Sequence, residues 1–331
     1  MKILITGSEG FIGSHLTEKL VEAGYKVRCF VLYNSNNSLG WLSKVDKKIL
    51  NNCKIFFGDI RDFNSVKNAV KNIDAIVHLA ALIGIPYSYS SPESYIDTNV
   101  KGTLNLLNAS LDSNISKFIH TSTSEVYGSA KYIPMDENHP INCQSPYSAS
   151  KSGADNLAIS YYRSFGLPVT ILRPFNTFGP RQSLRAVIPT IISQAIFNKN
   201  VIKIGNIKAK RDFTYISDTV NAFKIAINNK KIIGETINLG SNFEIQIQDI
   251  IKIVQKNLNT DLKLVFAKER LRPKKSELNR LLSNNKKAKK LLNWKLNYSG
   301  ISGFKEGIHK TIEWIKNNKN LFKDKTNKYT I

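Results

Sequence analysis

The sequence predicts an α/β fold in which a doubly wound parallel sheet is followed by a smaller C-terminal lobe. Three observations support this prediction. Nearly continuous apolar stretches of strand length alternate with amphipathic stretches of helix length through the first half, which is typical of parallel sheets buried on both faces. A glycine-rich turn joins the first strand to the first helix. Beyond about residue 176 the alternation becomes irregular, so we expect a second, smaller unit there.

The alternating stretches define the expected elements. Strands are predicted at residues 2–6, 26–32, 53–57, 75–79, 117–121 and 169–173, and helices at 11–23, 91–111, 146–165, 245–257 and 301–316. A chain of 331 residues is long for one compact core. We therefore predict a Rossmann-type, NAD(P)-binding domain over residues 1–175. Residues 176–317 are expected to form mainly a substrate-binding lobe, and residues 318–331 a polar tail.

The composition limits the classes of function. The 48 lysines and arginines outnumber the 25 acidic residues and give a net charge of +23. A nucleic-acid-binding surface is one interpretation of this excess, and attraction of an anionic small molecule is another. We favour solvated surface lysines and expect no nucleic-acid partner, because only ten of the basic residues are arginine and the lysines are spread thinly.

The location of the protein is predicted from its apolar runs and its cysteines. No run of 18 apolar residues occurs and the N-terminus is unlike a signal peptide, so we expect neither membrane association nor export. Cys29, Cys53 and Cys143 are scattered, without the spacing of a metal site. A reduced, cytoplasmic protein without a bound metal is expected.

The glycine-rich turn is the first indication of chemistry. Gly7, Gly10 and Gly13 stand at GxxGxxG spacing, where glycine lets the backbone approach a pyrophosphate at the positive end of a helix. The second strand ends at residues 30–35 with neither the acid that holds a ribose hydroxyl nor the arginine that accommodates an extra phosphate. We expect NAD as the cofactor, with NADP not excluded. Asp59 is a candidate partner for the adenine amino group or, alternatively, a helix N-cap.

A tyrosine and a lysine form the second indication. Tyr147 and Lys151 are four residues apart in a predicted helix and so share one face. An ammonium group beside a phenol lowers the pKa of the phenol, which can then accept a proton from a substrate hydroxyl near neutral pH. A run of hydroxyl residues from Thr121 to Ser124 follows the strand at 117–121 and can bind a sugar hydroxyl.

Together these motifs resemble the extended short-chain dehydrogenase/reductase family, whose members act on nucleotide-activated sugars. The resemblance spans nearly the whole chain. It rests on the glycine turn, Gly58-Asp59, His78-Leu79-Ala80-Ala81, Asn99, the Tyr147/Lys151 pair, Arg173-Pro174-Phe175-Asn176-Thr177-Phe178-Gly179-Pro180 and Arg211-Asp212-Phe213. It implies that the catalytic residues are Thr123, Ser124, Glu125, Tyr147 and Lys151.

The same resemblance implies the binding residues. The cofactor would contact Gly7, Gly10, Phe11, Ile12, Gly13, Asn34, Asp59, Ile60, Leu79, Ala80, Ala81, Asn99, Tyr147 and Lys151. The nucleotide sugar would contact Asn176, Arg181, Arg211 and Arg272, since the planar fork of arginine suits a diphosphate. It also implies a homodimer that pairs through the helices at 91–111 and 146–165.

Glu125 narrows the resemblance to one type of reaction. Thr123-Ser124-Glu125 resembles the 4,6-dehydratases, and within them the GDP-mannose enzymes more than the dTDP-glucose enzymes. The stretch from Leu82 to Tyr89, with residues 33–35 and 186–190, is similar to the dehydratases of the bacterial legionaminic acid pathway, which implies N-acetylglucosamine carried on GDP or UDP. Decarboxylases acting on UDP-glucuronate also carry Ser-Glu here.

The resemblance implies a sequence of proton and hydride transfers. Tyr147 would take the proton of the hydroxyl on carbon 4 as hydride leaves for the nicotinamide, and Glu125 would take the proton from carbon 5. Water would leave carbon 6 with acid help from Glu125 or Ser124, and the hydride would return to carbon 6. A 4-epimerase or a decarboxylase on the same scaffold, and a non-catalytic NAD(P)-binding regulator, are the alternatives.

Overall fold

A seven-stranded parallel sheet forms the centre of the computed structural model, which describes residues 1–198 and 200–322. Its order is β10-β6-β5-β4-β1-β2-β3. The strands are β1 Lys2–Thr6, β2 Lys26–Leu32, β3 Cys53–Gly58, β4 Ala75–His78, β5 Lys117–Thr121, β6 Val169–Pro174 and β10 Thr236–Leu239. The prediction of a doubly wound Rossmann-type sheet is confirmed.

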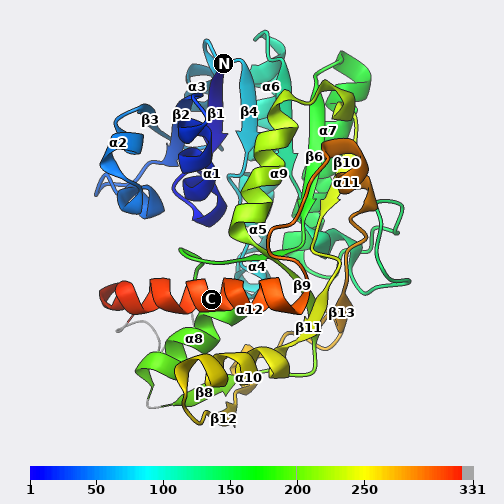
Figure 1. Cartoon of the computed structure of the whole chain (residues 1–331). Coiled ribbons are helices and arrows are strands. Elements are labelled where there is room, and N and C mark those ends of the chain that lie inside the picture. The colour runs from blue at the N-terminus through cyan, green and yellow to red at the C-terminus, as the bar shows by residue number, and fades with distance from the viewer. Residues whose placement is uncertain (199, 323–331) are drawn as a thin grey trace.

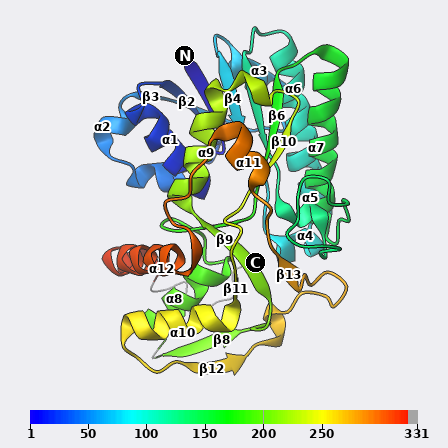
Figure 2. The same cartoon turned by 45° about the vertical axis from the view of Figure 1, so that its right-hand side comes forward.

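Helices cover both faces of this sheet (Figures 1 and 2). On one face lie α1 Phe11–Glu22 and α9 Ile216–Asn228, and on the other α3 Phe63–Val70, α6 Gly102–Leu111 and α7 Pro146–Phe165. Successive strand residues point to opposite faces. Ile3 and Ile5 of β1 therefore pack in the core beneath α1 and α9, while Leu4 packs in the core beneath α3, α6 and α7.

The helix predicted at 91–111 is interrupted. The structure has α5 Pro92–Tyr95, then a π-helical turn over Ile96–Lys101, then α6. The π turn buries Asn99. Gly102 follows the π turn and packs so closely on Ile60 that a Cβ there would stand 2.8 Å from the Ile60 side chain. Tertiary packing thus determines a local geometry for which the sequence pattern gives no indication.

The smaller lobe lies at the carboxyl end of the sheet, at the bottom of Figure 1. Its strands are β7 Asn176–Phe178, β8 Val201–Ile204, β9 Lys210–Tyr215, β11 Glu244–Gln246, β12 Lys263–Phe266 and β13 Arg280–Leu281. Its helices are α8 Val187–Phe197, α10 Ile247–Leu258 and α12 Gly300–Asn317. β9 pairs with β7, β11 and β13, and β8 pairs with β12.

Short helices complete the described chain. They are α2 Lys47–Leu50, α4 Ile85–Ser90 and α11 Lys286–Leu292, with 3-10 turns η1 Gly40–Lys44, η3 Ser124–Tyr127, η4 Lys230–Ile232, η5 Lys268–Arg270 and η6 Lys319–Leu321.

The chain crosses between the two units more than once, so the predicted boundary at residue 175 does not separate them. After β9 the chain returns to the large domain as α9 and β10, and β10 pairs with β6 at the edge of the main sheet. The predicted tail also begins later than residue 318, because the Phe322 side chain is buried and packs against Trp314. Residues 323–331 of that prediction lie outside the described residues.

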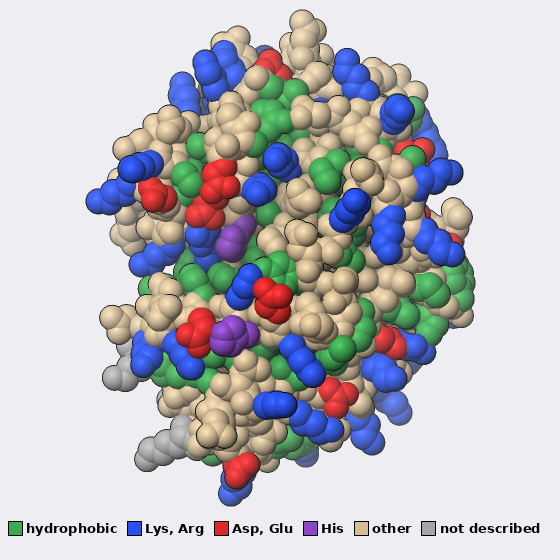
Figure 3. All heavy atoms as spheres, viewed as in Figure 1, with side chains coloured by type: hydrophobic (Ala, Val, Ile, Leu, Met, Phe, Trp, Pro, Cys, Tyr) green, Lys and Arg blue, Asp and Glu red, His purple; other side chains and the backbone are tan. Residues whose placement is uncertain are grey.

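The surface charge is distributed rather than concentrated on the face that Figure 3 shows. Lysine and arginine side chains are scattered there over both units, with acidic side chains among them. In the part of the chain that the structure describes, no helix is both long and apolar enough to cross a membrane.

Candidate active site

The candidate site lies at the carboxyl ends of the parallel strands, where the strand order reverses. From β1 the chain continues to β2 and β3 on one side, while β4, β5 and β6 lie on the other. Loops that follow β1 and β4 diverge at such a point and leave a crevice for a ligand. The glycine turn follows β1, and residues 79–81 follow β4.

The glycine turn packs too tightly for any larger residue. Gly7 has φ +70°, and a Cβ there would lie 2.8 Å from the backbone nitrogen of Ala80. A Cβ on Gly13 would lie 2.2 Å from the carbonyl oxygen of Gly7. No side chain caps the N-terminus of α1 at Gly10, so the first turn of the helix, with Phe11 and Ile12, can offer backbone N–H groups to an anion. These features fit the pyrophosphate of a dinucleotide.

The wall opposite the glycine turn is fixed by buried side chains. Thr6 Oγ1 accepts hydrogen bonds from the backbone N–H groups of Leu79 and Ala80, each at 3.2 Å. Asn99 bonds the backbone N–H and carbonyl of Leu82 at 2.8 and 2.9 Å, and donates to Ser150 Oγ at 2.9 Å. Asn99, predicted to contact the cofactor, therefore holds the loop that includes Ala81.

The residues predicted around the adenosine have partners within the chain. Asp59 forms an ion pair with Arg61 at 2.6 Å. Ile60 is buried against α6. The Asn34 side chain closes its own turn, accepting from the Ser38 N–H at 2.7 Å and donating to the carbonyls of Leu32 and Ser38. In the described chain Asn34 thus organises the loop after β2.

The catalytic candidates converge at the ends of β5 and α7. Thr123 caps η3, where its Oγ1 accepts from the Glu125 backbone N–H at 3.3 Å. Ser124 is buried beside it. Tyr147 and Lys151 lie in the first turns of α7, both buried, and the Tyr147 ring packs against Tyr95. The predicted helix at 146–165 has the same bounds in the structure.

The pKa values of this pair follow from burial. Burial raises the pKa of the Tyr147 phenol; a hydrogen bond with Thr123 opposes the rise and the nearby Glu125 carboxylate adds to it. Burial lowers the pKa of Lys151 to about 8, against the opposing charge of Asp155. The sequence predicts a lowered phenol pKa, whereas the structure gives the reverse direction because desolvation dominates.

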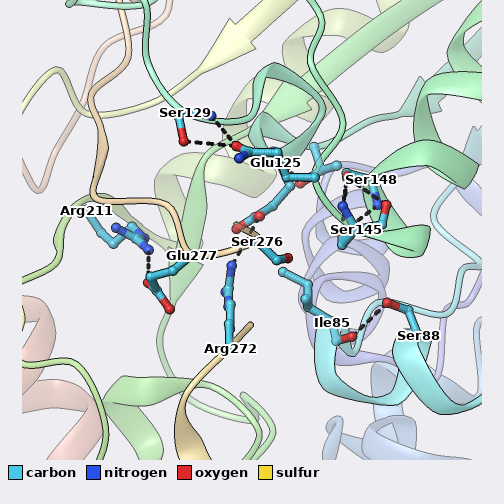
Figure 4. Close-up of polar contacts among 12 residues, drawn as sticks. Ile85, Ser88, Glu125, Ser129, Ser145, Ser148, Arg211, Arg272, Ser276 and Glu277 are labelled. Carbon is cyan, nitrogen blue, oxygen red and sulfur yellow. Dashed lines mark hydrogen bonds and ion pairs between the residues drawn. The ribbon is translucent and has the colours of Figure 1, made fainter. Parts of the chain in front are cut away.

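The two arginines predicted to hold a diphosphate each form an ion pair with a glutamate (Figure 4). Arg272 Nη1 lies 3.4 Å from Glu125 Oε2. Arg211 Nη2 lies 3.3 Å from Glu277 Oε1, with the guanidinium of Arg211 largely buried. Arg272 thus pairs with the predicted acid–base carboxylate itself. Burial lowers the pKa of Arg211, and the charge of the nearby Glu125 carboxylate opposes this fall.

The segment that carries Arg272 is bonded to two separate parts of the large domain. Ser276 Oγ lies 2.6 Å from the hydroxyl of Tyr89 in α4. Gln144 Nε2 donates to the carbonyl of Lys275 at 2.7 Å. These bonds hold the segment over the site.

The two remaining predicted substrate contacts serve the protein's own packing. Asn176 donates to the carbonyl of Asp212 at 3.1 Å. Arg181 makes a bidentate ion pair with Glu18 of α1, at 2.7 and 2.8 Å, and is buried. Arg181 thus fastens the lobe's first loop to α1, and its contact with the substrate stays a prediction.

A buried charged cluster centred on Asp155 of α7 was not predicted from the sequence. Asp155 Oδ2 accepts from Ser122 Oγ at 2.6 Å and from Arg173 Nη2 at 2.8 Å, and its Oδ1 lies 3.1 Å from His120 Nε2. Burial alone would raise the pKa of Asp155, but His120 and Arg173 lower it below its usual range. Asp155 follows Lys151 by four residues on the same helix face, a spacing that could have revealed it.

Among the residues that the structure describes, no three His, Cys, Asp or Glu side chains are arranged to hold a metal ion. The side chains that the site brings together are those of Tyr147, Lys151 and Glu125 and the hydroxyls of residues 122–124.

The fold and this site together define a class of protein, the extended short-chain dehydrogenases that modify nucleotide sugars. Comparison with known families identifies one family within this class. A family model described as GDP-mannose 4,6 dehydratase matches residues 4–311. The chain belongs to this family, and hence to the superfamily of nucleotide-sugar 4,6-dehydratases, epimerases and decarboxylases.

Relatives with different activities are similarly close. A putative UDP-glucose 4-epimerase of Methanocaldococcus jannaschii is 33% identical, over 96% of this chain and 99% of the relative. A UDP-N-acetyl-alpha-D-glucosaminuronate decarboxylase of Bacillus cytotoxicus is 34% identical, over 95% and 98%. The crystal structure of a dTDP-glucose 4,6-dehydratase from Streptomyces venezuelae, with NAD bound, matches with a TM-score of 0.86 and 27% identity, over 98% and 99%. This neighbour supports the prediction of NAD.

Proposed function

We propose that the protein is an NAD-dependent nucleotide-sugar 4,6-dehydratase that acts on GDP- or UDP-N-acetylglucosamine. The observation that carries the proposal is the position of Glu125. Its carboxylate lies close enough to Tyr147 to raise the pKa of the phenol, and it follows directly after Thr123 and Ser124. Hydride removal at carbon 4 requires only the tyrosine, the lysine and a hydroxyl. A further carboxylate beside them supplies the base that elimination across carbons 5 and 6 requires.

Each side chain then has a defined part in the reaction. Thr123 binds the hydroxyl on carbon 4, and Tyr147 accepts its proton with Lys151 beside it. Glu125 takes the proton from carbon 5, and Glu125 or Ser124 protonates the departing hydroxyl on carbon 6. Carbon 5 then regains a proton, from Tyr147 or from solvent, as the hydride returns to carbon 6. NAD, when bound, would supply the acceptance and return of that one hydride. The net reaction is loss of water, and no external reductant is consumed.

Arg211 and Arg272 would hold the diphosphate. In the structure they pair with Glu277 and Glu125 at 3.3 and 3.4 Å, respectively. A diphosphate offers guanidinium groups shorter, bidentate contacts. Binding would therefore release Glu125 from Arg272 at the moment when its carboxylate is needed.

The test is a panel of GDP-, UDP-, dTDP- and CDP-hexoses, with native mass spectrometry for binding and alkaline absorbance for a 4-keto product. The proposal expects a 4-keto-6-deoxy product from GDP- or UDP-N-acetylglucosamine, with solvent deuterium at carbon 5. A product inverted at carbon 4 without such deuterium would identify a 4-epimerase, and release of carbon dioxide from a uronic acid would identify a decarboxylase. Cofactor binding with no turnover of any sugar would identify a regulator.

The proposal includes a homodimer in the cytoplasm. Apolar side chains are exposed on the helices expected to pair, with Ile96 in the π turn 51% exposed, Leu111 of α6 40% and Phe165 of α7 61%. Burial of such side chains against a second copy would stabilise a two-fold dimer. Light scattering at micromolar concentration tests this, and a monomer would contradict it.

A further inference from the structure

The end of β2 carries an acid that comes from another element. Rossmann folds distinguish NAD from NADP at this position, and an acid there usually binds the ribose hydroxyls. Residues 30–35 contain no acid. In the structure Glu9, the third residue of the glycine turn, reaches across to this strand end. Its Oε1 accepts a hydrogen bond from the backbone N–H of Leu32 at 3.0 Å.

The backbone of Glu9 is fixed as firmly as its side chain. The backbone N–H of Trp41 in η1 donates to the Glu9 carbonyl at 2.9 Å. Gly40 approaches the same carbonyl so closely that a Cβ there would lie 2.8 Å from it, and Gly40 has φ +51°. The loop after β2 thus folds back onto Glu9, and the carboxylate has a defined orientation beside Leu32.

The second carboxylate oxygen needs a donor. Oε2 of Glu9 is buried and has no hydrogen-bond partner among the atoms that the structure describes. Burial raises the pKa of Glu9, and the Leu32 N–H opposes this rise. A buried carboxylate oxygen without a donor is unfavourable, and a ligand hydroxyl that donates to it would recover that free energy.

Asp59, Arg61 and Asn34, which lie near this strand end, have partners within the chain. The guanidinium of Arg61, beyond β3, bonds both oxygens of Asp59 at 2.6 to 3.0 Å. The Asn34 amide is used within its own turn. The lysines at 44, 47 and 48 follow in η1 and α2 and are exposed.

We propose that Glu9 is the residue that makes this enzyme select NAD over NADP. Its carboxylate would accept a hydrogen bond from the 2′-hydroxyl of the adenosine ribose, and it would repel a 2′-phosphate, which brings further negative charge to the same place. The inference rests on the NAD binding that belongs to the proposed function. It concerns the cofactor alone and does not depend on which sugar is turned over.

Isothermal titration of NAD⁺ and NADP⁺ into the full chain, freed of bound dinucleotide and without a sugar, tests the proposal. The wild type should bind NAD⁺ at least about tenfold more tightly than NADP⁺, as a charged hydrogen bond implies. Glu9→Gln should reduce this ratio by about tenfold or more, because it removes the charge and presents an amide to the ribose. Glu9→Asp, which keeps the charge but is too short to reach Leu32, should weaken NAD⁺ binding and leave NADP⁺ disfavoured.

Glu22→Gln is the matched control. Glu22 lies on α1 and is exposed, so the same change of charge there should leave both affinities unaltered. Two results would overturn the inference while leaving the proposed function intact: a wild type that binds both dinucleotides equally well, or a Glu9→Gln variant whose two affinities change by the same factor. Failure of the wild type to bind either dinucleotide would overturn the inference together with the proposed function.

Discussion

The contacts beneath the candidate catalytic pair differ in kind from those made by the arginines of the C-terminal lobe. Beneath Tyr147 and Lys151, the Asp155 carboxylate accepts two enclosed hydrogen bonds of 2.6 and 2.8 Å. On the lobe side the contacts are ion pairs of 3.3 and 3.4 Å between segments distant in sequence. Under the proposed function, the short, buried contacts would hold Tyr147 and Lys151 in place for chemistry, whereas the longer ion pairs could exchange a glutamate for the phosphates of a substrate.

The largest effect is expected from the chemical side. Tyr147→Phe removes one hydroxyl and keeps the ring that packs against Tyr95. Turnover should fall by about 10²- to 10⁴-fold, because the proton on the carbon 4 hydroxyl loses its acceptor. Steady-state kinetics measure this, with NAD⁺ titration as the control for folding. Activity within about threefold of the wild type would show that another group serves as the base.

The buried cluster should contribute to stability as well as to catalysis. Asp155→Asn leaves the Arg173 guanidinium buried beside a neutral amide. Loss of one partner from a buried pair costs about 3–5 kcal/mol of unfolding free energy. Urea denaturation measures the loss. Asp249→Asn, which removes the partner of Lys252 in an exposed pair, should change stability by less than about 1 kcal/mol. Equal stability of the two variants would mean that the buried cluster does not stabilise the fold.

On the recognition side, loss of an arginine should weaken binding more than it slows chemistry. Arg211→Ala should raise KM by about 10- to 100-fold with kcat little changed, because a phosphate contact stabilises ground and transition states alike. Arg280→Ala is the matched control, since Arg280 pairs with Glu244 near the surface. An unchanged KM for Arg211→Ala would remove this residue from the site.

The smallest effect is a shift in pH dependence. Burial lowers the pKa of Lys151 to about 8. Below that pH the ammonium form is present and supports loss of the phenol proton; above it the charge is lost, so kcat/KM should fall as pH rises. Asp155 raises the pKa of Lys151, so Asp155→Asn should move this limb to lower pH. A kcat/KM that stays constant up to about pH 10, near the ordinary pKa of lysine, would contradict the role assigned to Lys151.

The sequence predicted those parts of the molecule that depend on local pattern. The strands at 2–6, 26–32 and 117–121 have the same bounds in the structure, because buried parallel strands are nearly continuous apolar runs. It missed β10, which lies beyond residue 176, where the alternation that identifies the other strands of the sheet is lost. It gave no indication of the π turn at Ile96–Lys101, which results from packing.

The same distinction applies to the site. Tyr147 and Lys151 were found because their spacing in one helix shows which face they share. His120, Ser122, Asp155 and Arg173 come from separate elements, and only the folded chain brings them together. Glu9 was missed because an acid was sought at the end of β2, whereas the structure brings one there from the preceding turn.

The central claim, that Glu125 performs the elimination, is tested most directly by one turnover of the Glu125→Gln variant. The variant, loaded with NAD⁺, is mixed with GDP- or UDP-N-acetylglucosamine, whichever the wild type dehydrates, and the absorbance of reduced nicotinamide is followed. Because Thr123, Tyr147 and Lys151 are untouched, oxidation at carbon 4 should proceed and then stall, so reduced cofactor accumulates while the 4-keto-6-deoxy product falls by about 10²-fold or more. Glu277→Gln, the same change on the partner of Arg211, should still form that product. Undiminished formation of the dehydrated product by Glu125→Gln would contradict the claim.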